Sequence, residues 1–205
     1  DSDRSIIELT NDLIEMYKVI SSKDTMFEQG LWAELFSILY VKNNYDINIS
    51  KFWHNDNFNK YDFSFNENTK LEVKSTSKEL REHRFSHEQI YTNYDVIISS
   101  VKVRKDDNGY TVFDLYSQVE QLFESRYDLL IKIEKELKKI DKNNLDRYDF
   151  EYSIQNIKFY LNKNTPHFDK PEPEGIHGTE YTVVFENVEE LTADNLVKLI
   201  GDYSE

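Results

Sequence analysis

Between residues 61 and 74 the apolar side chains alternate strictly, and this segment restricts the possible folds more than any other. Phe63 and Phe65 alternate with polar neighbours, a polar NENT stretch follows, and Leu71 and Val73 alternate again. This pattern predicts a β-hairpin. If its loop is residues 66–68, Phe63 faces Leu71 across the pair, and all these apolar side chains share one face.

The same register brings Asp62 and Glu72 directly opposite each other, and Lys74 follows two residues later on the same face. Adjacent carboxylates destabilise a fold unless something compensates their charge, and a hard divalent cation does so. The pattern therefore predicts a Mg²⁺ site, with Mn²⁺ as a substitute. Lys74 would orient or help deprotonate an attacking water and stabilise developing negative charge. The alternative is a solvated polar face on an edge of the sheet.

Two details bear on this interpretation. We expect Asn66 or Asn68 to take the left-handed conformation that short hairpin loops commonly need. Asp128 with Glu136-Leu137-Lys138 repeats the spacing of acid, gap and acid-x-Lys, but it lies in a helical pattern. The hairpin context is what distinguishes the first match.

The rest of the chain reads as a mixture of helices and strands. Apolar spacing predicts helices at the N-terminus, strands in the middle and, after them, a helical pair or one long broken helix. In chain order the predicted elements are helices over 3–20 and 25–42, a strand over 94–103, a turn at 106–109, helices within 113–140, a bulged strand over 150–161, a surface loop over 166–178, a strand over 181–188, and a helix between Thr192 and Gly201.

Length and composition indicate one domain over residues 1–205. There is no Cys, which excludes disulfides, thiol catalysis and thiolate zinc sites and favours a reducing compartment such as the cytoplasm. No apolar run is long enough for a membrane span and the N-terminus has no secretion signal, so we expect no membrane partner. Because the chain opens on Asp, a preceding domain could lie outside it.

The net charge of −14 argues against a protein that coats nucleic acid, because phosphate binding relies on Lys and Arg. Any DNA contact must therefore be local. Residues 70–105 reverse the trend, with eight Lys or Arg against five acids. The alternative is that this is an ordinary solvated stretch.

Asp62 and Glu72-Val73-Lys74, on consecutive strands after a helix, resemble the core of the PD-(D/E)XK nuclease superfamily. The resemblance implies an α/β/α sandwich with a mixed central β-sheet (restriction-endonuclease-like) and a divalent metal, usually Mg²⁺. A Pro often precedes the first Asp there, whereas this chain has Tyr61. A helical segment over 113–141 and C-terminal strands and a helix over 150–205 would be added to a core at about 25–105.

A closer similarity extends through GLWAELFSILYV (30–41), YDF (61–63), LEVKST (71–76) and HRFSHEQI (83–90). These segments resemble an uncharacterised bacterial branch of the superfamily that is associated with restriction and phage-defence loci. That resemblance implies that Glu34 assists the metal site through water and that Gln89 touches the metal water or the scissile phosphate. Glu34 could instead reach solvent at the edge of an apolar helix face.

The basic residues around Gln89 are candidates for binding DNA phosphate. They are Lys78, Arg81, His83 and Arg84. The alternative is that Phe85 is a core residue and that its neighbours only face solvent.

The leading hypothesis is a Mg²⁺-dependent DNA endonuclease of restriction or phage defence that hydrolyses phosphodiester bonds with metal-activated water. A second hypothesis is an inactive nuclease scaffold for DNA binding or assembly, because the chain is acidic and its helical region suits homodimer packing. A third is an acidic interaction domain. Partner proteins from a defence system are compatible with the first two, and RNA stays open as a substrate.

Overall fold

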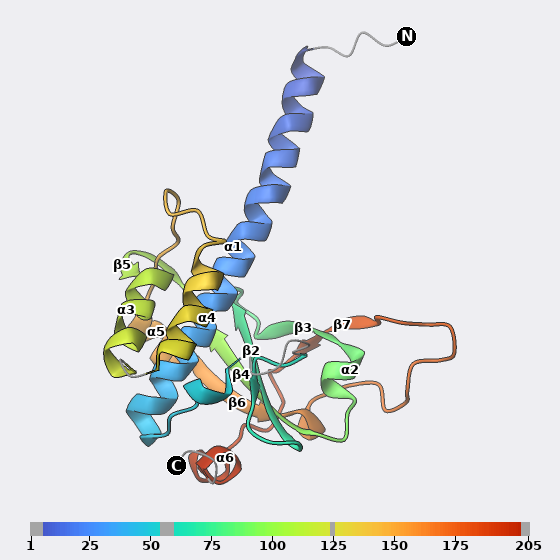
Figure 1. Cartoon of the computed structure of the whole chain (residues 1–205). Helices are drawn as coiled ribbons and strands as arrows, with labels where there is room; N and C mark the ends of the chain where they lie inside the picture. Colours follow the sequence, from blue (N-terminus) through green and yellow to red (C-terminus); the bar gives the residue numbers. More distant parts are fainter. Residues whose placement is uncertain (1–5, 54–59, 124–125, 202–205) are drawn as a thin grey trace.

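A four-stranded mixed sheet lies at the centre of the computed structural model, which describes residues 6–53, 60–123 and 126–201 (Figure 1). The strands are β1 (Phe63–Ser64), β2 (Thr69–Thr76), β4 (Asp95–Lys102) and β6 (Ile157–Leu161), in the order β1-β2-β4-β6. β2 and β4 are parallel, and the two outer pairs are antiparallel. The expected mixed central sheet is confirmed.

The β1–β2 hairpin has the register derived from the sequence. Phe63 pairs with Leu71, and the Phe65 N–H donates to the Thr69 carbonyl over 3.1 Å. The expected left-handed Asn is wrong, because Asp46 is the only non-glycine residue with positive φ in the described ranges. Instead the Asn66 side-chain oxygen accepts hydrogen bonds from the backbone of the next turn residues, and this closes the loop without a strained residue.

One helix, α1 (Ile6–Tyr45), replaces the two helices expected at the N-terminus. The SSKD segment between the two predicted helices holds neither Pro nor Gly, so nothing in it interrupts the backbone hydrogen bonds. At about 1.5 Å per residue the helix is roughly 60 Å long, and its first half extends away from the rest of the molecule (Figure 1). No helix among the described residues has the length and apolarity to cross a membrane.

The second half of α1 covers one face of the sheet. Its buried side chains, Trp32 and Phe36 among them, pack on sheet residues such as Leu71 and Ile97. The expected helical pair is present as α3 (Val112–Leu122) and α4 (Tyr127–Leu137), which extend this core together with α6 (Ala193–Ile200). As expected, Thr192 caps α6, because its hydroxyl accepts the Asn195 N–H.

The other face of the sheet carries a smaller layer. Its elements are β3 (Glu82–Ser86), α2 (His87–Ile90) and β7 (Glu180–Val184), of which β3 and β7 form a separate antiparallel pair. Phe85 and Phe185 from this layer pack on Ile98 and Tyr160 of the sheet. This layer therefore contains more strand than the expected sandwich, and β7 ends four residues earlier than the predicted 181–188.

The predicted bulged strand over 150–161 is only partly present. Residues 150–156 form a helix, α5 (Phe150–Asn156), and only β6 is a strand. The Asp149 side chain caps α5 by accepting the Tyr152 N–H over 2.9 Å. The slip in apolar spacing therefore marks the boundary between a helix and a strand, not a bulge.

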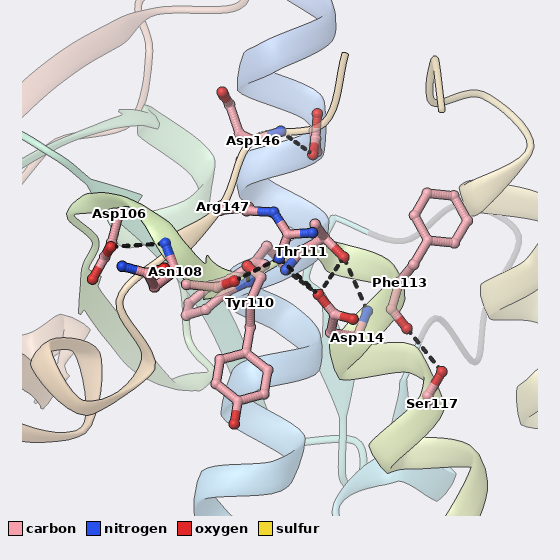
Figure 2. Close-up of polar contacts among 12 residues, drawn as sticks. Asp106, Asn108, Tyr110, Thr111, Phe113, Asp114, Ser117, Asp146 and Arg147 are labelled. Carbon is pink, nitrogen blue, oxygen red and sulfur yellow. Dashed lines mark hydrogen bonds and ion pairs between the residues drawn. The ribbon is translucent and has the colours of Figure 1, made fainter. Parts of the chain in front are cut away.

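The predicted turn at 106–109 lies within β5 (Lys105–Tyr110), and Asp106 does form a side-chain turn with the Asn108 N–H. β5 makes bridges to Tyr148, and Arg147 donates to the Gly109 carbonyl (Figure 2). A Cβ at Gly109 would lie 2.4 Å from the Tyr148 carbonyl oxygen, so only glycine fits. Two 3-10 helices complete the fold, η1 (Ser50–Phe52) and η2 (Asn162–Asn164).

Candidate active site

Asp62 lies directly before β1, opposite Glu72 in the hairpin register. Its Oδ2 atom accepts the Val73 N–H over 2.7 Å. β1 begins only at Phe63, so the Asp62 side chain, which precedes the strand, accepts this backbone N–H of β2. The backbone of the neighbouring strand thus fixes the orientation of the first acid.

Glu72 is the most enclosed acid of the site, with 4% of its surface exposed. Its Oε1 atom accepts from Lys74 Nζ over 2.6 Å and from Gln89 Nε2 over 2.8 Å. Its Oε2 atom is buried without any hydrogen-bond partner among the described residues. A buried carboxylate oxygen without a partner is costly, so this position suits a cation or a hydrogen-bond donor.

The two acids oppose each other's ionisation. Burial raises the pKa of Asp62 well above its usual range, and the charges of Glu72 and Glu34 raise it further. The hydrogen bond from the Val73 N–H and the charge of Lys74 act in the opposite direction. Burial also raises the pKa of Glu72, although Lys74 and Gln89 act in the opposite direction. Positive charge near these carboxylates would therefore stabilise the folded protein.

Glu34 approaches this pair from α1. Its charge raises the pKa of both acids, so Glu34 lies within electrostatic range of Asp62 and Glu72. Its Oε2 atom accepts the Trp53 indole N–H over 2.7 Å. Trp53 was not a candidate from sequence; it is buried and forms a bridge with Phe63 of β1.

Gln89 contacts the site through Glu72, and both of its amide hydrogens are used. They go to Glu72 Oε1 and to the Lys60 carbonyl, and the amide oxygen accepts the N–H of Ser86, the N-cap residue of α2. The hydroxyl of Tyr61 lies 3.3 Å from the Glu88 carbonyl oxygen and 3.4 Å from that of Gln89. Gln89 therefore positions Glu72, and Tyr61 links α2 to the start of β1.

The structure divides the four candidates for phosphate binding into two groups. Lys78 and Arg84 are exposed and form ion pairs with Glu82 and Glu180. Arg81 and His83 are buried, at 5% and 4% exposure, so their predicted contact with DNA phosphate is wrong. They pack inside the layer of β3, where no phosphate can reach them.

Ser100 of β4 holds both of the buried residues. Arg81 donates to its hydroxyl oxygen over 2.7 Å, and the same oxygen lies 2.6 Å from His83 Nε2. Burial, with the charges of Arg81 and Lys74, lowers the pKa of His83 to about 3. His83 is thus a neutral core residue.

The acids at this site suit a cation that keeps much of its water. Among the described residues, no group of three or more His, Asp or Glu is placed so that it could hold a metal ion, which leaves the pair Asp62 and Glu72. Mg²⁺ is commonly held by one or two carboxylates, with water and substrate phosphate completing the octahedron. Asp62 and the unpartnered Oε2 of Glu72 fit that requirement.

A mixed sheet flanked by helices, with an acid before its first strand and Glu-x-Lys on the second, defines a nuclease-like protein with a restriction-endonuclease-like core. The chain belongs to the family described as "Putative PD-(D/E)XK family member (DUF4420)", whose profile matches residues 12–185. The family match thus extends the resemblance seen over 25–105 to most of the chain. No match was found among curated proteins or among solved structures.

Proposed function

We propose that this chain is a divalent-metal-dependent DNA endonuclease that acts in restriction or phage defence in the bacterial cytoplasm. The observation that carries the proposal is the Oε2 atom of Glu72, buried and unpartnered beside a second acid and a lysine. A structural ion pair would need only the contact between Lys74 and Oε1. An additional buried carboxylate without compensation is typical of a site made for a cation.

Each residue then has a distinct task. Asp62 and Glu72 would hold Mg²⁺ or Mn²⁺, and Glu34 would act through water from α1. The cation, when bound, supplies Lewis acidity and lowers the pKa of bound water. Lys74 stabilises negative charge that develops on the phosphoryl oxygens during hydrolysis. Gln89 holds Glu72 in the rotamer that keeps Oε2 available.

The test is incubation of supercoiled plasmid DNA with purified protein and Mg²⁺ or Mn²⁺, and with chelator as a blank. Lys74→Ala should lower the cleavage rate by about 10²–10³-fold. Lys163→Ala is the matched control, because Lys163 also pairs with an acid, Asp95, at the opposite end of β4. The control should cleave like the parent chain.

Two results would contradict the proposal. Cleavage that survives in Lys74→Ala, or that is absent from the parent chain with varied DNA, excludes the proposed chemistry. An inactive scaffold predicts cation binding at Asp62 and Glu72 without cleavage, and an acidic interaction domain predicts neither. A parallel RNA substrate decides between the two nucleic acids.

The defence role is supported only by the resemblance of residues 30–90 to a branch found at restriction and phage-defence loci. Cells that express the chain with its neighbouring genes should lower the plating efficiency of phage, and the Lys74→Ala chain should not. Partner proteins from the same locus and a homodimer through 113–141 are part of this proposal. Light scattering of the purified chain tests the dimer.

A further inference from the structure

A surface hollow of about 450 Å³ lies beside β7, outside the candidate active site. Its walls include Phe168 and Tyr181, whose rings meet edge to face with centroids 5.3 Å apart, and the outward side chains Thr182 and Val184. The Phe168 side chain is 64% exposed. We call this feature the Phe168 hollow. Its volume is in the range of small-molecule sites.

The loop that carries Phe168 is held firmly in position. It contains all three prolines of the chain, and Glu172 accepts the Thr179 N–H over 2.6 Å. In turn the Thr179 carbonyl accepts the His87 N–H over 2.7 Å. The exposed ring is therefore presented by a restrained backbone, and it loses little conformational entropy when a ligand binds.

Phe168 also lies near the helix that carries Gln89. It lines a second hollow of about 260 Å³ together with His87, the first residue of α2. Two residues later in the same helix, Gln89 donates to Glu72. Figure 1 shows the loop before β7 extending alongside α2.

An exposed cation lies on the strand next to the hollow. Arg84 pairs with Thr182 in the β3–β7 register, its side chain is 74% exposed, and it forms an ion pair with Glu180 that a phosphate would replace. The loop itself carries the acids Asp169, Glu172 and Glu174, which disfavour a row of phosphates there. A flat ring with a single adjoining phosphate fits this combination better than a duplex backbone does.

We propose that the Phe168 hollow binds one unpaired base of the nucleic-acid substrate, stacked on Phe168, while Arg84 contacts a neighbouring phosphate. The inference rests on the proposed function and adds a substrate feature to it. Stacking on an aromatic ring contributes about 1–3 kcal/mol per base. This contribution does not come from the net charge, which is −14 and opposes the binding of phosphates.

Phe168→Trp provides a direct test. The two native tryptophans, Trp32 and Trp53, are buried, but Trp53 contacts Glu34 of the candidate active site, so the signal of the parent chain is subtracted and the difference reports on the hollow. In chelator, which prevents metal-dependent cleavage, a single-stranded oligonucleotide should quench its fluorescence, and the blunt duplex of the same sequence should not. Phe168→Ala should weaken single-strand binding by about 5–150-fold. Ile176→Ala, an exposed apolar residue of the same loop, should leave it unchanged.

The outcomes separate this inference from the proposed function. If the indole is not quenched and Phe168→Ala binds like the parent chain, the hollow is not a base site, although metal-dependent cleavage of plasmid can persist. Equal quenching by duplex overturns the requirement for an unpaired base. If the parent chain neither cleaves nor binds any oligonucleotide, the nuclease assignment fails and this inference fails with it.

Discussion

Asp62→Asn removes one of the two facing carboxylates and keeps the shape of the side chain and an acceptor for the Val73 N–H. The pKa of Asp62 is raised in the folded state, mainly by burial and then by Glu72 and Glu34. The parent chain is therefore most stable where Asp62 is protonated, and it loses stability as pH rises from about 4 through the raised pKa. The variant does not carry this loss, so it should be the more stable protein at pH 8.

The magnitude follows from the hairpin geometry. Directly opposite residues have Cβ atoms about 5 Å apart, and two unit charges at that distance repel by about 3 kcal/mol at an effective dielectric constant of 20. Lys74 offsets part of this repulsion through its contact with Glu72. We expect Asp62→Asn to gain about 1–3 kcal/mol at pH 8, or roughly 3–9 °C in melting temperature for a chain of this size.

Thermal unfolding in chelator at pH 5 and pH 8 measures the effect, which should shrink at the lower pH. Asp128→Asn is the control, because Arg126 lowers the pKa of that exposed acid to about 2 and the amide should give no gain. With Mn²⁺ at about 1,000 times its Kd, the parent chain should gain about 4.1 kcal/mol and overtake the variant. If Asp62→Asn is less stable than the parent at pH 8 without metal, the electrostatic reasoning is wrong.

Three further substitutions test other parts of the structure. Gly109→Ala should cost about 1–3 kcal/mol in urea unfolding, because its Cβ would meet the Tyr148 carbonyl, and an unchanged midpoint would contradict that contact. Tyr61→Phe should weaken Mn²⁺ binding a few-fold in calorimetry by loosening α2, whereas Tyr94→Phe, which alters the ring beside it, should not. Glu34→Gln should weaken Mn²⁺ binding by about 10-fold yet raise the melting temperature at pH 8; lower stability there would refute its place beside the acids.

The hairpin and its acids were predictable because they depend on local rules. A period of two, a three-residue loop and the alternation of faces fix the register, and with it the position of Asp62 opposite Glu72. The second match to the spacing, at Asp128, lies in α4 as its apolar pattern indicates. Sequence also identified Gln89, although its contact with Glu72 depends on a chain fold that no spacing reveals.

The errors came from long-range packing. Arg81 and His83 lie in a basic stretch that looks exposed, but Ser100 on another strand satisfies both of them inside the core. At residues 150–161 one apolar pattern spans a helix and a strand, and only the cap at Asp149 marks the change. Sequence rules for local periodicity cannot show which polar side chains find buried partners.

The contacts of Gln89 change how the acid pair should be understood. Since Lys74 and Gln89 both occupy Oε1 of Glu72, they cannot compensate Oε2, and they prevent the carboxylate from rotating to relieve it. A half-turn would only exchange two equivalent oxygens and again leave one without a partner, and a smaller rotation would cost Lys74 and Gln89 their shared acceptor. The surrounding structure therefore maintains an unfavourable arrangement that a cation would relieve. Functional sites commonly contain local arrangements of this kind, which lower the stability of the fold. Because Gln89 has no amide hydrogen left for substrate, its loss should first appear in cation affinity, and only through that in the cleavage rate.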